Sequence, residues 1–310
     1  MTSARVNARL GLLQVCAAGV LWGTGGLVVT VLHERDGVGA MTVSAWRMAI
    51  AAVALALFVL VSGRAAAVRD MFRTHPLTAA VIGCGTAVYQ GLYFVSVLMV
   101  GVSVATVVAL GLAPVLTATW EHLRARTLPT SRDVIVLAAA LTGLVLISTT
   151  AGHGASGPGD RPVLGLVLAV AAGATYAATT ILGHVLAPRV EPVALTTCAT
   201  LAGAVLLSPF LIHAAATNAP VAGASATSWA LLLYLGVATM ALAYGLLYSG
   251  LRTTPGSAAT VATLVEPISA AALAAVLLDE RLSAAGLVGA ALILAAVVAL
   301  RPAQEQLPPP

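Results

Sequence analysis

The sequence contains no lysine, and charged residues of all types make up only 8% of its 310 positions. Soluble domains carry about 25% charged residues, so this chain has too few to cover a water-exposed surface. Apolar residues make up 60% of the chain, which also excludes intrinsic disorder. The composition therefore predicts a polytopic membrane protein.

Cysteine is scarce as well. Cys16, Cys84 and Cys198 each lie inside an apolar run, without the close spacing of a metal site, so we expect no disulfide, metal or other cofactor. The basic residues are all arginines that stand singly or in small groups between apolar runs. This distribution is typical of topology determinants and not of a nucleic-acid-binding stripe.

Ten apolar runs approach the length of about 20 residues that a bilayer crossing requires. The runs lack two-residue alternation, which favours helices over barrel strands. They cover residues 10–32, 39–62, 77–98, 101–120, 133–150, 163–186, 193–213, 227–250, 255–277 and 284–300. We therefore predict an all-α membrane protein with ten transmembrane helices.

Arginine placement predicts the orientation of these helices. With the N-terminus inside, eleven arginines fall in cytoplasmic segments and three on the opposite side, while Arg47 lies within the second run. The positive-inside rule then places both termini in the cytoplasm. We expect a multi-pass protein of a bacterial inner membrane.

The two halves of the chain are similar to each other at an offset of about 154 residues. The landmark pairs are Trp22 with Tyr176, Tyr89 with Tyr244, Tyr93 with Tyr248, and Pro114 with Pro267. Because each copy holds five helices, an odd number, the second copy is inverted in the membrane. We predict repeats over residues 10–150 and 163–300, joined by the loop 151–162. Such folds bind substrate near the midplane and alternate access by rocking one half on the other.

Several short motifs carry a resemblance to a known family. They are Leu21-Trp22-Gly23, Trp46-Arg47-Met48, Leu264-Val265-Glu266-Pro267, Leu278-Asp279-Glu280-Arg281-Leu282-Ser283 and Gly289-Ala290-Ala291-Leu292-Ile293-Leu294. Their order and spacing resemble the EamA branch of the drug/metabolite transporter superfamily. The resemblance implies ten helices and export of small metabolites or amphiphilic compounds by secondary transport. The first repeat departs from the pattern, because Ala113 stands where the family has an acid before Pro114.

Two charged residues fall inside predicted spans, where a charge costs about 2.5–3.5 kcal/mol on insertion scales. Glu266 lies near the middle of its run. It is either a hydrogen-bonded structural acid or a functional carboxylate that couples protons or contacts a cationic substrate group. Arg47 is either an outer-side anchor or a binding group for a substrate carboxylate or phosphate. Glu121 lies at a helix end, where we expect it to be solvated.

Aromatic residues are few, 5% of the chain, but they recur at helical spacing. Tyr89 and Tyr93 are four residues apart, as are Tyr244 and Tyr248, so each pair lies on one helix face. Together with Trp22 and Tyr176 they form either an aromatic substrate cavity or packing between helices. Pro114 and Pro267 each remove a backbone donor, and we expect a helix break at both.

No catalytic signature is convincing. The string Gly154-Ala155-Ser156-Gly157 resembles a serine-protease motif but lies in a glycine-rich loop, and we expect no enzyme. The favoured function is an exporter of a small-molecule substrate in the lipid bilayer, with protons as a candidate coupling ion. The alternatives are a proton-coupled metabolite importer and a membrane assembly or receptor protein without transport. The sequence is compatible with a homo-oligomer.

Overall fold

The computed structural model describes residues 2–100, 102–150, 162–223, 225–277 and 283–300, and these are helical with no β-strand. The helices are α1 (Thr2–Asp36), α2 (Ala40–Val61), α3 (Ala65–Thr74), α4 (Pro76–Val100), α5 (Val102–Ala125), α6 (Ser131–Thr150), α7 (Pro162–Leu186), α8 (Pro192–Ala216), α9 (Ala226–Gly236), η1 (Val237–Leu242, a π-helix), α10 (Ala243–Gly250), α11 (Gly256–Ala262), α12 (Val265–Leu277) and α13 (Ala284–Ala299). The all-α prediction is confirmed.

Nine stretches of the described chain are long and apolar enough to cross a membrane. The eighth runs without interruption through α9, η1 and α10, and the ninth covers α11 and most of α12. Helix α13 is apolar but only 16 residues long. The structure thus supports a multi-pass membrane protein, with nine long spans and one shorter apolar helix where the sequence predicted ten spans.

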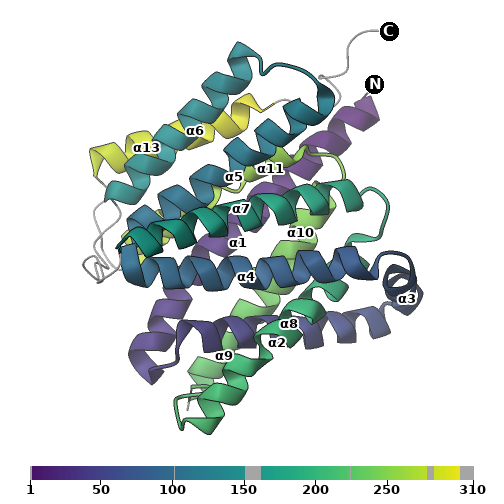
Figure 1. The fold of residues 1–310 in the computed structure, drawn as a ribbon, viewed down its shortest axis with the longest axis vertical. Coiled ribbons are helices and arrows are strands. Elements are labelled where there is room, and N and C mark those ends of the chain that lie inside the picture. Colours follow the sequence, from purple (N-terminus) through teal and green to yellow (C-terminus); the bar gives the residue numbers. More distant parts are fainter. Residues whose placement is uncertain (1, 101, 151–161, 224, 278–282, 301–310) are drawn as a thin grey trace.

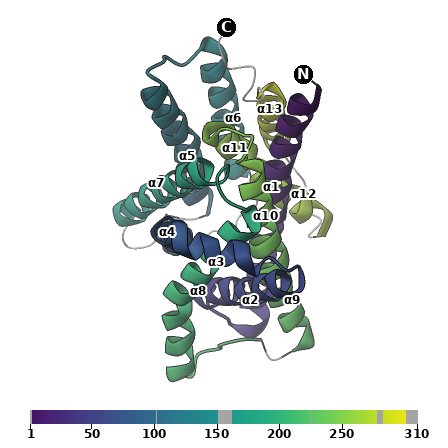
Figure 2. The same cartoon turned by 90° about the vertical axis from the view of Figure 1, so that its right-hand side faces the viewer.

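The helices form one bundle in which segments from the two halves of the chain alternate (Figure 1). Helices α6 and α13 pack together at one edge, and α2, α8 and α9 lie at the other. Helices α4, α5, α7 and α1 lie between these edges, and the turned view in Figure 2 shows the same order. The middle of the bundle is therefore built from both halves.

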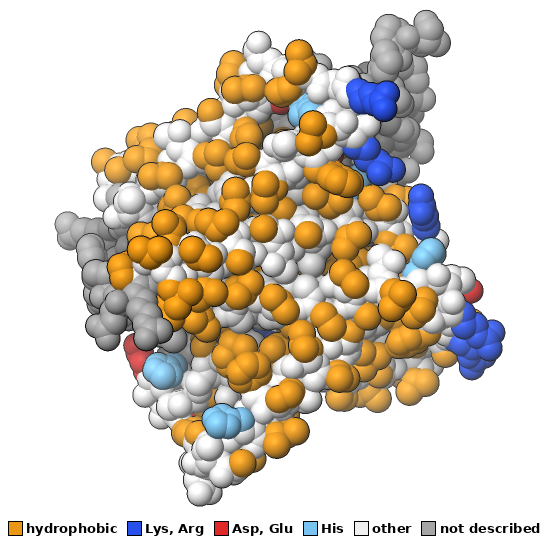
Figure 3. All heavy atoms as spheres, in the orientation of Figure 1, with side chains coloured by type: hydrophobic (Ala, Val, Ile, Leu, Met, Phe, Trp, Pro, Cys, Tyr) orange, Lys and Arg blue, Asp and Glu red, His pale blue; other side chains and the backbone are white. Residues whose placement is uncertain are grey.

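Hydrogen bonds join several helix ends at one end of the bundle. Thr253 Oγ1 donates to the carbonyl of Asn7, Arg64 pairs with Glu191, and an Arg132 Nη donates to the carbonyl of Ala299. Arginines gather along the corresponding edge of the surface in Figure 3. We call this the arginine-rich end, and its described arginines are Arg9, Arg64, Arg69, Arg73, Arg124, Arg126, Arg132, Arg189 and Arg252. At the opposite end the described arginine is Arg35.

Helix α3 lies at this arginine-rich end and was not predicted from the sequence. Met71 is buried, whereas Arg69, Asp70 and Arg73 are exposed. The helix is thus amphipathic, with a narrow apolar face toward the protein. It is too short and too polar to register as an apolar span, which is why a search for membrane crossings overlooked it.

Of the two expected helix breaks, the structure contains one. A non-helical turn at Thr263 and Leu264 separates α11 from α12, just before Pro267. The carbonyl of Thr263, four residues before the proline, accepts instead from the N–H of Glu266 at 2.9 Å. The expected break at Pro114 is wrong, because α5 runs through it from Val102 to Ala125. There, Thr117 Oγ1 donates to the carbonyls of Ala113 and Pro114 at 2.9 and 3.1 Å.

A close glycine contact joins α6 to α13. A Cβ placed on Gly143 would lie 2.6 Å from the carbonyl oxygen of Gly289, and one on Gly289 would lie 2.7 Å from that of Gly143. These distances are too short for any side chain. The two helices therefore approach backbone to backbone, as small residues permit in membranes.

Candidate functional site

Two aromatic pairs lie at the centre of the bundle, each between the two halves of the chain. The ring of Tyr89 on α4 stacks on Tyr176 of α7, with 5.0 Å between centroids. The ring of Trp22 on α1 packs against Tyr244 of α10, also with 5.0 Å between centroids. The landmark residues that align the two halves in sequence thus contact each other across the two halves.

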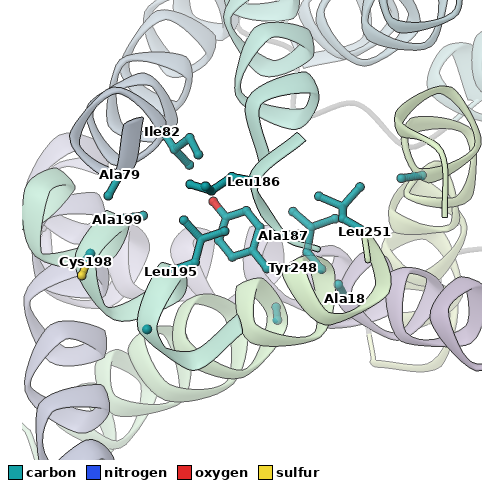
Figure 4. Close-up of a cluster of buried hydrophobic side chains, with 14 of the residues drawn as sticks. Ala18, Ala79, Ile82, Leu186, Ala187, Leu195, Cys198, Ala199, Tyr248 and Leu251 are labelled. Atoms are coloured by element: carbon teal, nitrogen blue, oxygen red, sulfur yellow. The ribbon is translucent and has the colours of Figure 1, made fainter. Parts of the chain in front are cut away.

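The remaining two tyrosines extend these pairs along their helices. Tyr93 lies 6.1 Å from Tyr89, and Tyr248 lies 6.0 Å from Tyr244, between ring centroids. The Tyr93 hydroxyl is 2.7 Å from Thr106 Oγ1 on α5. Tyr248 is only 2% exposed, and Figure 4 shows it within an apolar cluster beside Leu186, Leu195 and Leu251. Tyr248 therefore borders the centre but packs mainly as part of the core.

Arg47 lies beside this aromatic centre and is anchored from two other helices. One terminal nitrogen donates to Thr239 Oγ1 on η1 at 3.1 Å, and the other donates to Gln90 Oε1 on α4 at 3.4 Å. The indole nitrogen of Trp22 donates to the carbonyl of Thr239 at 2.9 Å. The widened turn of a π-helix is common at functional sites, and here Thr239 on η1 contacts both Trp22 and Arg47.

Two donors in this group have no hydrogen-bond partner among the residues that the structure describes. They are Arg47 Nε and Gln90 Nε2, and both atoms are buried. Gln90 is 6% exposed as a whole residue. Neither Gln90 nor Thr239 was predicted as a site residue. No sequence motif marks them, because Thr239 is 192 residues from its partner Arg47.

Glu266 lies in the first turn of α12, directly after the turn that interrupts the ninth span. It is half-buried, and its charge is attracted by that of Arg47. Within the described residues the one ion pair closer than 4.0 Å is Arg64 with Glu191. The charges of Arg47 and Glu266 therefore attract each other, but the two side chains do not form a contact ion pair.

Small cavities lie next to the rings. Two of them share Thr86, Tyr244 and Tyr248 in their walls, and the second also borders Tyr89 and Tyr176. Each has about 10 Å³ of free volume, which is about the space that one water molecule requires. These two cavities are too small for a metabolite, so a substrate needs rearrangement of the surrounding helices to enter them.

A third group of contacts ties α5 to α11 between the rings and the arginine-rich end. The Glu121 carboxylate accepts from the Ser257 N–H at 3.0 Å and also from the Ser257 hydroxyl. Thr117 and Thr260 lie 2.9 Å apart between their hydroxyl oxygens, and the Tyr176 hydroxyl is 3.1 Å from Thr263 Oγ1. Glu121 is thus partly exposed and bound to the first turn of α11, a contact that the sequence did not predict.

The predicted site residues therefore converge, with differences in detail. Trp22, Arg47, Tyr89, Tyr176, Tyr244 and Glu266 lie around the centre, with Tyr93 and Tyr248 to either side. Pro267 follows the central turn, whereas Pro114 lies inside a continuous helix. The protease-like string at residues 154–157 lies outside the described residues.

Comparison with known proteins gives the geometry its context. The sequence matches the EamA-like transporter family over residues 9–149 and again over residues 163–301. The chain belongs to the EamA-like transporter family. This family is part of the drug/metabolite transporter superfamily, so the protein is a membrane transporter that acts on small molecules. EamA-like proteins are transporters and not enzymes.

Individual relatives of this EamA-like protein agree with that assignment. It is 29% identical to the uncharacterized transporter YwfM of Bacillus subtilis (strain 168), over 95% of this chain and 94% of the relative. It is 25% identical to the uncharacterized transporter YetK of the same organism, over 54% of this chain and 50% of the relative. A crystal structure of another protein matches the fold with a TM-score of 0.76 at 20% identity, covering 96% of both chains.

Proposed function

We propose that the protein is a secondary transporter that exports small metabolites or amphiphilic compounds across a bacterial inner membrane by alternating access. The observation that carries this proposal is the pair of central ring contacts, Tyr89 with Tyr176 and Trp22 with Tyr244. Both join one half of the chain to the other at the level of the helix break. The rings line the centre of the bundle, and Arg47 and Glu266 lie at the same level.

The proposal includes two inverted five-helix repeats, at residues 10–150 and 163–300. The repeated family match supports this division, and so does the pattern of helix contacts. Helix α4 packs on α7 as α10 packs on α1, and α5 packs on α7 as α12 packs on α1. A twofold axis in the membrane plane would place each of these helix pairs on its equivalent in the other half. This is the symmetry of inverted-repeat transporters. In this arrangement α13 is the counterpart of α6 and forms the tenth crossing.

The arginine-rich end is proposed to face the cytoplasm, with both chain termini there. The excess of arginine at that end supports this orientation through the positive-inside rule. The amphipathic helix α3 then lies at the cytoplasmic surface, where its arginines contact water and lipid headgroups. The contacts of Glu121, Thr117 and Tyr176 with α11 and the turn after it lie between the central rings and the cytoplasm.

In the proposed cycle, these contacts between α5 and α11 break and re-form. With Glu121 bound to Ser257 and Thr117 to Thr260, α5 and α11 are held together on the cytoplasmic side. Export requires their separation for substrate to enter and their closure before release outside. Each of these hydrogen bonds uses at least one side chain and none is an internal backbone bond of a helix, so they break without loss of a helix.

Glu266 is proposed to couple this cycle to protons. A carboxylate at the level of the helix break, attracted by Arg47 but not paired with it, is able to accept a proton when the cavity opens. A proton-coupled importer uses the same parts in the opposite direction, and the direction of the proton gradient that drives accumulation distinguishes the two.

Cysteine labelling tests the proposal without knowledge of the substrate. Thr106 and Thr260 are equivalent positions of the two proposed repeats, and both are buried. In a variant without native cysteines, Thr106→Cys and Thr260→Cys should react with impermeant maleimides added from the outer and the cytoplasmic side, respectively. Locking one position by cross-linking should protect it and raise the reactivity of the other. Independent labelling of both positions from one side would contradict alternating access.

A further inference from the structure

Helix α3 lies at the boundary between the spans and the water at the arginine-rich end. In Figure 1 it lies beyond the end of α4 and runs crosswise to that helix. Val61 at the end of α2 and Leu77 at the start of α4 are 89% and 80% exposed, and apolar side chains exposed on spans contact lipid. Because α3 joins these two ends, it lies at the level of the lipid headgroups.

The exposed residues of α3 follow a definite order around the helix. At about 100° per residue, the order is Phe72, Arg69, Arg73 and Asp70, with the buried Met71 on the opposite side. Phe72 is 49% exposed although it is a large apolar residue. The order is thus apolar, then basic, then acidic. It matches the change from hydrocarbon through phosphate groups to water that a helix in the membrane interface meets.

The two arginines in this order are not neutralised by the protein. Within the described residues, the one ion pair closer than 4.0 Å joins Arg64 to Glu191. Arg69 and Arg73 are therefore available to an external anion, even with Asp70 close by in the chain. They are four residues apart, so they are neighbours on one helix face. Guanidinium groups bind phosphate oxygens through paired N–H donors.

We propose that α3 is a binding site for anionic phospholipids. Arg69 and Arg73 bind the headgroup phosphate, Phe72 inserts among the acyl chains, and Asp70 faces water. A free phosphate ion would use the same arginines but would leave the exposed ring of Phe72 without a role. A zwitterionic lipid binds less well, because its own amine competes with the arginines for the phosphate. The site lies apart from the central rings, so the inference does not depend on the substrate or on the direction of transport.

Tryptophan fluorescence of a Phe72→Trp variant tests the site in the full-length protein reconstituted in phosphatidylcholine vesicles. The quenchers are brominated phosphatidylglycerol, which is anionic, and brominated phosphatidylcholine, at equal mole fractions. The wild-type protein, with four tryptophans, supplies the background to be subtracted. An arginine near an anionic surface contributes about fivefold in affinity, so two should favour phosphatidylglycerol by about 25-fold. About 1 M salt should reduce this preference by screening.

Two outcomes of the quenching experiment would overturn the proposal. Equal quenching by the two lipids would show that the site does not select charge. Quenching by acrylamide in water but by neither lipid would show that this face contacts water or a soluble partner. Inorganic phosphate should leave the lipid preference unchanged, and its displacement of phosphatidylglycerol would assign the arginines to a soluble anion instead.

Paired substitutions then locate the preference on α3. Arg69→Gln combined with Arg73→Gln, in the Phe72→Trp background, should abolish most of the preference for phosphatidylglycerol. Arg69→Lys combined with Arg73→Lys keeps the charge and should retain it. Arg124→Gln combined with Arg126→Gln is the matched control, because it removes the same charge from exposed positions at the same end. Equal losses in the α3 pair and the control pair would assign the preference to overall charge and contradict a site on α3.

Discussion

The Glu121 carboxylate is bound to the backbone N–H of Ser257 at a distance of 3.0 Å, although 136 residues separate them. A carboxylate at the N-terminal end of a helix satisfies a free N–H and interacts favourably with the helix dipole. In this protein the acid comes from α5 and the helix is α11, so the capping interaction also connects two spans. Its loss should affect both stability and access.

Glu121→Ala should therefore lower stability by about 1 kcal/mol, the typical cost of losing an N-terminal cap. It should also raise maleimide labelling of Thr260→Cys from the arginine-rich end, because α5 is no longer tied to α11. The control is Glu34→Ala, which removes an exposed acid of α1. Reduced stability without any change in labelling would assign Glu121 a structural role only.

Glu266→Gln should separate exchange from accumulation. The amide resembles the protonated acid, so exchange of substrate across a proteoliposome membrane should survive while accumulation driven by a pH gradient is lost. If Glu266 contacts a cationic substrate group instead, both activities should fall together. Wild-type transport with wild-type pH dependence would leave Glu266 a structural acid.

Replacement of a ring in the central pairs should weaken substrate binding. Tyr89→Phe keeps the stacking on Tyr176 and should retain most transport. Tyr89→Ala removes an aromatic contact of a kind worth about 1 kcal/mol. If the ring contacts substrate, the substrate should bind about fivefold more weakly. Tyr234→Ala, on the half-exposed face of α9, is the comparison. Equal transport by Tyr89→Ala and wild type would show that the ring serves packing alone.

Fusion reporters should place both termini in the cytoplasm. Alkaline phosphatase is active only outside the inner membrane, so fusions at the N-terminus and at the C-terminus should both be silent. A fluorescent reporter that folds in the cytoplasm should be active at the same sites. An active C-terminal phosphatase would mean that α13 does not complete a tenth crossing.

Gly289→Val should destabilise the protein by about 1–3 kcal/mol, the usual cost of overpacking. A Cβ at this position would lie 2.7 Å from the carbonyl oxygen of Gly143. Gly245→Val is the matched control, because no heavy atom lies within 4 Å of a Cβ there. Thermal unfolding in detergent compares the two variants, and similar unfolding temperatures would contradict the reported glycine contact.

The sequence predicts the spans well because bilayer thickness and backbone hydrogen bonding leave few alternatives to long apolar helices. It also identified the central rings, since four-residue spacing and repetition between halves are visible in one dimension. Gln90 and Thr239 could not be found in this way, because their importance comes from contacts with Arg47 across the bundle. Glu121 looked like a solvated helix end because its partner, Ser257, is distant in sequence.

The prediction of matching helix breaks failed for a related reason. A proline removes one donor wherever it occurs, but the result depends on what replaces that bond. At Pro114 the freed carbonyl is that of Leu110, and α5 continues through this position. Before Pro267 the Thr263 carbonyl accepts from Glu266 instead, and the helix is interrupted. Local sequence similarity does not encode this difference between the two repeats.

The glycine contact of α6 with α13 limits how the halves are able to move. Backbones in direct contact have no flexible side chains between them to keep touching as the gap widens, so separation loses the whole interface at once. Rotation about the contact point preserves it. Since α6 and α13 come from opposite halves, this contact restricts how far the halves separate at this edge. A second contact of this kind, in which a Cβ on Gly83 of α4 would lie 1.9 Å from the carbonyl oxygen of Ala199 on α8, restricts separation of the halves away from this edge as well.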